Sequence, residues 1–227
     1  MSEVVTITSK KKKAPFIIGL IVLIFAITGV VSIVNFAVSK LSTGEEETVD
    51  YSEYADFLTW VVGVDPAPFS DITNADKDTL RNIAICTLLS DDVKTGDYNV
   101  TEDGLIVPAA DVEKYYFDMF GADVGIIHAS VVGYGYEFTY NAGDNTYTVP
   151  LTGVTPPFSV RIESVQKTGG LAVLRVGYVG TNNVEVLPDG TLAPTQPDKY
   201  ADITIRETET GFNLISVMTV TVGEFNG

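Results

Sequence analysis

Histidine and cysteine, the side chains that most often carry out chemistry, each occur once in the chain, as His128 and Cys86. A single histidine cannot build a multi-histidine metal site, and no recognisable motif pairs it with a cysteine nucleophile. His128 follows the apolar pair Ile126-Ile127, which favours a structural role. Cys86 lies in the apolar run 83–89, which favours burial, and without a second cysteine no internal disulfide can form. Motifs for serine hydrolysis and for nucleotide phosphates are also absent, so we expect no catalytic residues, no metal site and no cofactor.

One segment places oxygen-bearing side chains at alternate positions, as a calcium loop would: Asp97, Asn99, Thr101 and Asp103. It departs from the EF-hand pattern because its sixth position is glutamate rather than glycine and its twelfth is proline rather than glutamate. Asp, Asn and Thr also stabilise turns through their side chains. A turn at Asp103-Gly104 is therefore the preferred interpretation, with calcium binding as the alternative.

Aromatic residues with a spacing of two form the most distinctive pattern in the chain. On a strand, this spacing puts the side chains on one face. They could line a ligand pocket in a concave sheet, or they could fill the core beneath helices, which is the preferred interpretation. The ligand-pocket candidates are Tyr134, Tyr136, Phe138, Tyr140, Tyr147 and Tyr115, and the carboxylates that a reactive pocket could use are Asp111 and Glu137.

These residues must be positioned by three helices followed by about six strands. Apolar side chains recur at helical spacing over 51–62, which Gly63 should end, and over 74–89 and 109–120. Thr73 or Asn74 could cap the second helix. Beyond Gly125 the period becomes two, and short connections between strands imply antiparallel neighbours. The sequence therefore predicts an α+β domain with three helices packed on one face of a curved antiparallel sheet of about six strands.

The order of elements over residues 51–220 resembles the nuclear-transport-factor-2-like fold, a cone-shaped α+β unit, with a cystatin-like sheet as the alternative. The segment from Gly104 to Gly121 is similar to uncharacterised membrane-anchored proteins of Gram-positive bacteria. The first resemblance implies a cone whose pocket can serve an enzyme or a binding module. The second implies a bacterial cell-surface setting and no activity.

Residues 16–38 contain no charged side chain. A helix that spans a bilayer needs about 20 apolar residues, whereas the core of a cleaved signal peptide, the alternative here, usually has about 7–15. Lysines precede the stretch and glutamates follow it, which places the N-terminus in the cytoplasm. The predicted divisions are a basic cytoplasmic tail (1–14), a transmembrane helix (15–38), an acidic linker (39–50) and an extracellular domain (51–227).

The formal net charge of −16 hides an asymmetry, because residues 1–43 carry a net charge of +4 and the rest of the chain carries −20. Such a domain repels nucleic acid and anionic lipid, so no nucleic-acid partner is expected. We expect a cell-surface binding or assembly module without catalytic activity, anchored in the cell membrane. Its partners would be the bilayer, through residues 15–38, and a membrane or surface protein. The alternative is a small-molecule enzyme or ligand sensor that uses a pocket in the concave sheet.

Overall fold

The computed structural model describes residues 50–133, 135–180 and 196–220. They belong to one compact unit, Asp50–Gly227. The predicted tail, transmembrane helix and linker lie outside the described residues, apart from Asp50 at the end of the linker. Of the helices that are described, none has the length and apolar character needed to cross a membrane.

The described chain is α+β, with four α-helices, one 3-10 helix and two antiparallel sheets. The helices are α2 (Ser52–Val64), η1 (Ile72–Asn74), α3 (Lys77–Leu89), α4 (Asp92–Thr95) and α5 (Ala109–Phe120). The helix predicted over 109–120 has these bounds, because Pro108 precedes it and Gly121, with a φ of 92°, follows it.

Two helix ends differ from the prediction. Gly63 does not end α2, because the glycine lets the helix pack closely: a Cβ there would lie 2.7 Å from Pro156 Cβ and 3.2 Å from the ring of Trp60. The helix α3 starts later than residue 74, because Asp76 caps it by accepting the N–H of Thr79 at 2.8 Å.

The first sheet has the strand order β1-β2-β5-β4-β3 and the second has the order β6-β7-β8-β9. All neighbours are antiparallel. The first sheet contains β1 (Asn99–Val100), β2 (Leu105–Pro108), β3 (Val131–Val132), β4 (Glu137–Asn141) and β5 (Thr146–Val149). The second contains β6 (Phe158–Thr168), β7 (Leu171–Gly180), β8 (Lys199–Thr208) and β9 (Gly211–Val220).

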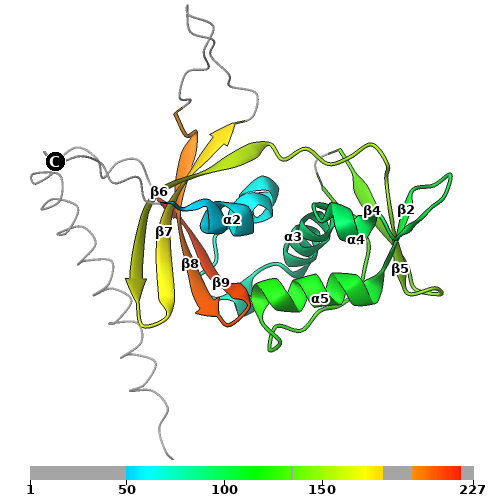
Figure 1. Cartoon of the computed structure of the whole chain (residues 1–227), viewed down its shortest axis with the longest axis horizontal. Helices are drawn as coiled ribbons and strands as arrows, with labels where there is room; N and C mark the ends of the chain where they lie inside the picture. Colours follow the sequence, from blue (N-terminus) through cyan, green and yellow to red (C-terminus); the bar gives the residue numbers. More distant parts are fainter. Residues whose placement is uncertain (1–49, 134, 181–195, 221–227) are drawn as a thin grey trace, which may run out of the picture. The chain divides into compact units, whose positions relative to one another are not determined.

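The prediction of one curved sheet of about six strands is therefore wrong. Pro150, Pro156 and Pro157 lie between β5 and β6, and a proline cannot donate to a sheet ladder. The chain leaves the first sheet at Val149 and starts a second one at Phe158. Figure 1 shows α2, α3 and α5 between the two sheets, so the helices do not cover one face of a single sheet.

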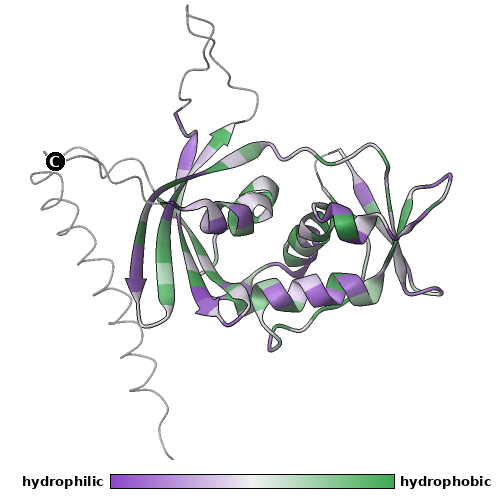
Figure 2. Ribbon diagram, in the orientation of Figure 1, coloured by the Kyte–Doolittle hydropathy of each residue, from purple (hydrophilic) through white to green (hydrophobic). Residues whose placement is uncertain are grey.

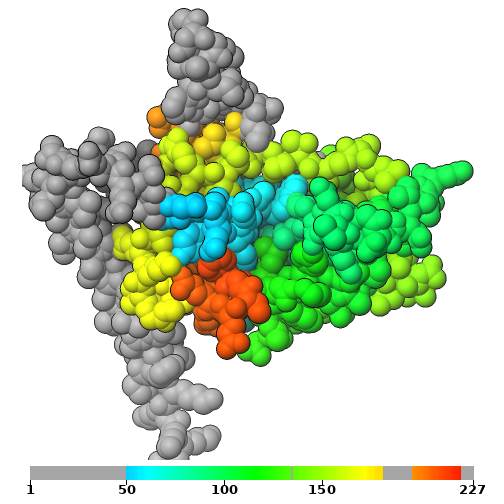
Figure 3. Space-filling model, viewed as in Figure 1, coloured from blue at the N-terminus to red at the C-terminus, as the bar shows by residue number. Residues whose placement is uncertain are grey.

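The space between the sheets is filled by one hydrophobic core to which all three long helices contribute. Hydrophobic and hydrophilic residues alternate along the strands and around α5 (Figure 2), as expected for elements with one buried face. On the face seen in Figure 3, the hairpin of β8 and β9 lies against α2 and α5. Asn213 of β9 donates from Nδ2 to the carbonyl oxygen of Asp118 in α5 at 2.8 Å.

Candidate functional site

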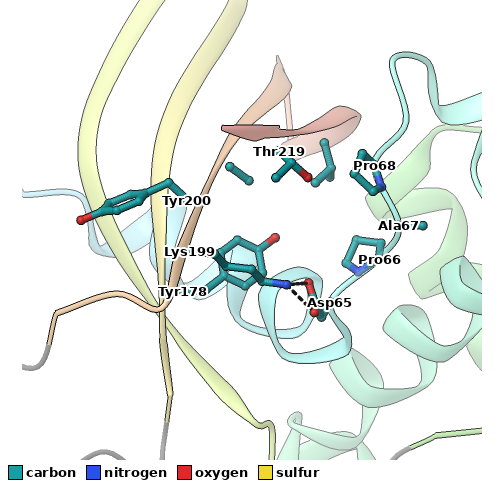
Figure 4. A pocket seen from close by; sticks show the side chains of 10 residues that line it. Asp65, Pro66, Ala67, Pro68, Tyr178, Lys199, Tyr200 and Thr219 are labelled. Atoms are coloured by element: carbon teal, nitrogen blue, oxygen red, sulfur yellow. Dashed lines mark hydrogen bonds and ion pairs between the residues drawn. The ribbon is translucent and has the colours of Figure 1, made fainter. Parts of the chain in front are cut away.

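A pocket of about 200 Å³ lies where α2 ends beside the second sheet (Figure 4). Its wall is formed by the turn 65–68 after α2, by Tyr178 of β7, by residues 199–201 of β8, and by Val217 and Thr219 of β9. We call it the Lys199 pocket, because the side chain of Lys199 reaches across it to Asp65 (Figure 4).

The turn that forms one wall is dictated by local sequence. Asp65 ends α2 in a left-handed conformation (φ 55°, ψ 64°), and its N–H donates to the carbonyl oxygen of Val61 at 3.3 Å. Pro66 and Pro68 follow, and neither can continue the helix. Phe69 and Val217 then exchange two backbone hydrogen bonds of 2.8 and 2.9 Å, which fix the turn against β9.

The polar wall of the pocket is an ion pair. Lys199 donates from Nζ to both carboxylate oxygens of Asp65, at 2.6 and 2.5 Å. The same ammonium lies 4.9 Å from the ring centroid of Tyr178 and 5.1 Å from that of Phe158, within range of cation–π attraction. The side chains of the pair remain 39% and 26% exposed, so both charged groups can be reached from solvent.

Register explains the aromatic contacts of Lys199. Tyr178 of β7 is paired with Lys199 of β8, so the two side chains extend from the same face of the sheet. Burial raises the pKa of the Tyr178 hydroxyl, and the negative charge of Asp65 acts in the same direction. The tyrosine therefore stays neutral at physiological pH. The pocket thus presents one cation, one anion and a neutral aromatic ring.

The predicted aromatic residues belong to the core near the first sheet. Phe138 and Tyr147 are fully buried. Tyr136 stacks on Phe138 with ring centroids 4.7 Å apart, and Tyr140 packs on Tyr147 at 5.1 Å. Tyr134 lies outside the described residues.

The described candidates lie on different elements of the fold. Tyr115 is on α5, where its hydroxyl donates to Asp91 Oδ2 at 2.6 Å. Tyr136 lines a second pocket of about 10 Å³, room for roughly one water molecule. Among the described candidates, none lines the Lys199 pocket. Their assignment as ligand-pocket residues stays a prediction.

The two candidate carboxylates lie on different elements, Asp111 on α5 and Glu137 on β4. Asp111 accepts from the Tyr98 hydroxyl at 2.9 Å and pairs with Lys94 at 3.1 Å. Glu137 is exposed on β4. Asp111 is thus held in a surface network beside α4, where burial and Asp111 itself raise the pKa of Tyr98.

His128 connects α5 to β5. Its Nε2 lies 2.9 Å from Glu113 Oε1 and its Nδ1 lies 2.9 Å from the Tyr147 hydroxyl. The imidazole stacks on Tyr140 at 5.2 Å. Burial raises the pKa of Tyr147 to about 12, so this phenol is neutral and can serve as a hydrogen-bond partner to the imidazole.

Cys86 is fully buried, and burial raises the pKa of its thiol to about 12. Because the thiolate is the reactive form, this cysteine has little nucleophilic character. In the part of the chain that the structure describes, no three His, Cys, Asp or Glu side chains are grouped as metal ligands. The candidate calcium segment is a hairpin in which β1 pairs with β2, and its turn contains Asp103-Gly104 as predicted.

Comparison with known proteins gives no assignment. No protein-family model matches the chain, and no curated protein or solved structure matches it significantly. The Lys199 pocket was missed by sequence reasoning because its two charged residues are 134 positions apart. The local sequence offers Pro66 and Pro68, which keep the helix from continuing but do not indicate which residue Asp65 pairs with.

Proposed function

We propose that the chain is a membrane-anchored binding or assembly module at the cell surface, with its C-terminal domain outside the cell and no catalytic activity. The observation that carries this proposal is the uncharged stretch 16–38, with four lysines before it and three glutamates after its linker lysine. Such a stretch is long enough for a permanent anchor. The proposed partners are the bilayer, through residues 15–38, and a membrane or surface protein.

The chemistry of the described domain supports binding over catalysis. Its cysteine is buried with a raised pKa. Its histidine is engaged on both ring nitrogens by Glu113 and Tyr147. The net charge of −16 favours solubility and disfavours nucleic acid as a partner. The resemblance to membrane-anchored surface proteins of Gram-positive bacteria fits this proposal, and the nuclear-transport-factor-2-like or cystatin-like resemblance stays a prediction.

The Lys199 pocket favours a second candidate, a ligand sensor that is tethered to the membrane. A concave site with convergent charged groups and an apolar wall is the usual form of a small-molecule site. In that case the ectodomain would report the ligand to a membrane partner. The pocket replaces the concave face of a single sheet as the place where such a ligand would bind.

Protease treatment of intact cells tests the anchor and its orientation. In untreated cells, we expect a C-terminal epitope on the full chain to be found in the membrane fraction. Protease added to intact cells should then digest this epitope. A matched variant that lacks residues 16–38 should leave the epitope protected inside the cell. Release of the intact domain into the medium would instead indicate a cleaved signal peptide. Protection of the wild-type epitope would place the domain in the cytoplasm and refute the proposal.

Crosslinking of intact cells tests the assembly role. The full chain should be recovered with a membrane or surface protein at defined stoichiometry. The control is a chain in which residues 1–49 are kept and the ectodomain is replaced by an unrelated folded domain. Equal recovery of the partner by this control would assign the interaction to the anchor. Failure of both to recover any partner would contradict an assembly function.

A further inference from the structure

We propose that the Lys199 pocket binds a small zwitterion with an apolar body, of the class of free amino acids. The ligand's ammonium group would contact Asp65 and its carboxylate would contact Lys199. This inference rests on the proposed function of the domain as a binding module and gives it a site and a ligand class.

Charge pairing in the wall selects a zwitterion. An ammonium has three N–H donors and a carboxylate accepts at about four lone-pair positions, so the two contacts of 2.6 and 2.5 Å leave Lys199 and Asp65 with unused capacity. A ligand with one net charge would satisfy one of the two groups and crowd the other with like charge. A zwitterion satisfies both groups, because its ammonium can face Asp65 while its carboxylate faces Lys199.

Apart from the ion pair, the wall is lined mainly by apolar residues, with Tyr200 and Thr219 adding hydroxyl groups. This lining favours a ligand with an apolar body. Pro66, Ala67 and Pro68 form one side, and Ala201 and Val217 form the other. Burial of apolar ligand atoms against such surfaces contributes about 25 cal/mol per Å². Tyr178 adds a neutral aromatic ring beneath the ammonium of Lys199. The side chain of an apolar amino acid therefore has a matching surface.

The volume of the pocket and the negative charge of the chain narrow the class of ligand further. The volume of about 200 Å³ lies below the range of roughly 300–1,000 Å³ that is common for drug-sized ligands, so a small metabolite fits better than a peptide or a sugar chain. The net charge of −16 repels anions from the domain. A neutral zwitterion approaches without this penalty.

The site is also preorganised. The turn 65–68 is fixed by the paired hydrogen bonds between Phe69 and Val217, and Lys199 is held over the rings of Tyr178 and Phe158. The groups that contact the ligand therefore lose little conformational freedom on binding. An ion pair that served only to join α2 to β8 would not need an apolar cavity beside it.

The test is calorimetric titration of the full chain in detergent micelles with three probes that share the isobutyl side chain of leucine. L-leucine carries both charges, 4-methylpentanoate lacks the ammonium and 3-methylbutylamine lacks the carboxylate. We expect L-leucine to bind and each analogue to bind at least about tenfold more weakly, the effect of one lost charged hydrogen bond. Absence of L-leucine binding, or equal binding of the three probes, would overturn the inference.

Variants assign the binding to the pocket. Lys199→Met should abolish L-leucine binding, whereas Lys114→Met, which removes a lysine from an exposed pair with Asp118, should leave it unchanged. If Lys199→Met does not fold, Asp65→Asn decides the question, because it keeps the size of the side chain and weakens the ammonium contact. Unchanged binding in the folded pocket variant refutes the site. A domain that is exposed at the surface and does not bind L-leucine refutes this inference and leaves the binding-module proposal intact.

Discussion

The hydroxyl of Tyr136 provides a sharp test of whether the aromatic residues near the first sheet are core or pocket. It donates to Asn82 Oδ1 at 2.9 Å and lies 3.7 Å from Cys86 Sγ. Asn82 is only 6% exposed, so its carbonyl oxygen has little access to bulk water. After the change Tyr136→Phe, that oxygen keeps the Cys86 thiol at 3.5 Å, which is a weak donor. The stacking of the ring on Phe138 is retained.

The expected loss of stability follows from this geometry. A buried acceptor without a good donor costs about 1–3 kcal/mol. The matched control is Tyr140→Phe, whose lost hydroxyl donates to Asn145 Oδ1 at 2.8 Å in an exposed turn. Water replaces that bond, so the control should change the free energy of unfolding by no more than about 0.5 kcal/mol. The two variants remove the same atom from the same residue type.

Urea unfolding of the full chain in micelles measures both variants. Trp60 is the only tryptophan in the sequence, and it is 9% exposed with its Nε1 donating to Ser90 Oγ at 2.5 Å. Its fluorescence should therefore report unfolding of the domain. A Tyr136→Phe variant as stable as Tyr140→Phe would refute the reasoning. It would mean that water reaches Asn82, and a hydrated space there would support the ligand-pocket interpretation of the aromatic residues.

Three further predictions concern a cap, a thiol and a turn. Asp76→Ala should cost about 1 kcal/mol. The hydrogen bonds from Thr79 lower the pKa of Asp76 below its usual 3.8. The extra free energy of unfolding of the wild type over Asp76→Ala should therefore be present at pH 7 and should shrink as the pH falls below about 4. Parallel pH profiles of urea unfolding for the two proteins would contradict this. Cys86 should react with iodoacetamide only after unfolding in urea, as mass spectrometry would show, and rapid labelling of the native chain would contradict its burial. Gly104→Ala should cost at least about 1 kcal/mol, because φ is 146° and a Cβ would clash with the backbone of β5, whereas Gly143→Ala, with open space around it, should be close to neutral in the same assay.

The helices were the most predictable part of the fold, because their signals are local. The helix at 109–120 was predicted with its observed bounds from one apolar stripe between Pro108 and Gly121. The end of α2 was not predicted correctly, because a glycine such as Gly63 can have two opposite effects on a helix. Glycine can stop a helix, and it can also let a helix approach a neighbour closely, as here with Pro156. The choice depends on a residue 93 positions away, which local reasoning does not include.

The antiparallel pairing of the strands was predicted correctly, but the number of sheets was not. Alternation identified most of the strands and their antiparallel order, but it does not say which strands share a sheet. The prolines at 150, 156 and 157 were the signal for the break between β5 and β6. The prediction instead placed all strands after Gly125 in one sheet, because short connections imply antiparallel neighbours.

The Lys199 pocket shows why a search for reactive residue types does not find binding sites in such a chain. Neither Asp65 nor Lys199 is unusual in the sequence, and each is surrounded by residues that predict only a helix end or a strand start. Their chemistry comes from placement: strand register sets Lys199 beside Tyr178, and the bridge between Phe69 and Val217 sets Asp65 opposite. A site of this kind needs no rare side chain and no motif. Sequence reasoning gives most weight to histidine and cysteine, but in this domain both make contacts within the fold. The groups that a ligand could reach are the side chains of a common acidic residue and a common basic residue.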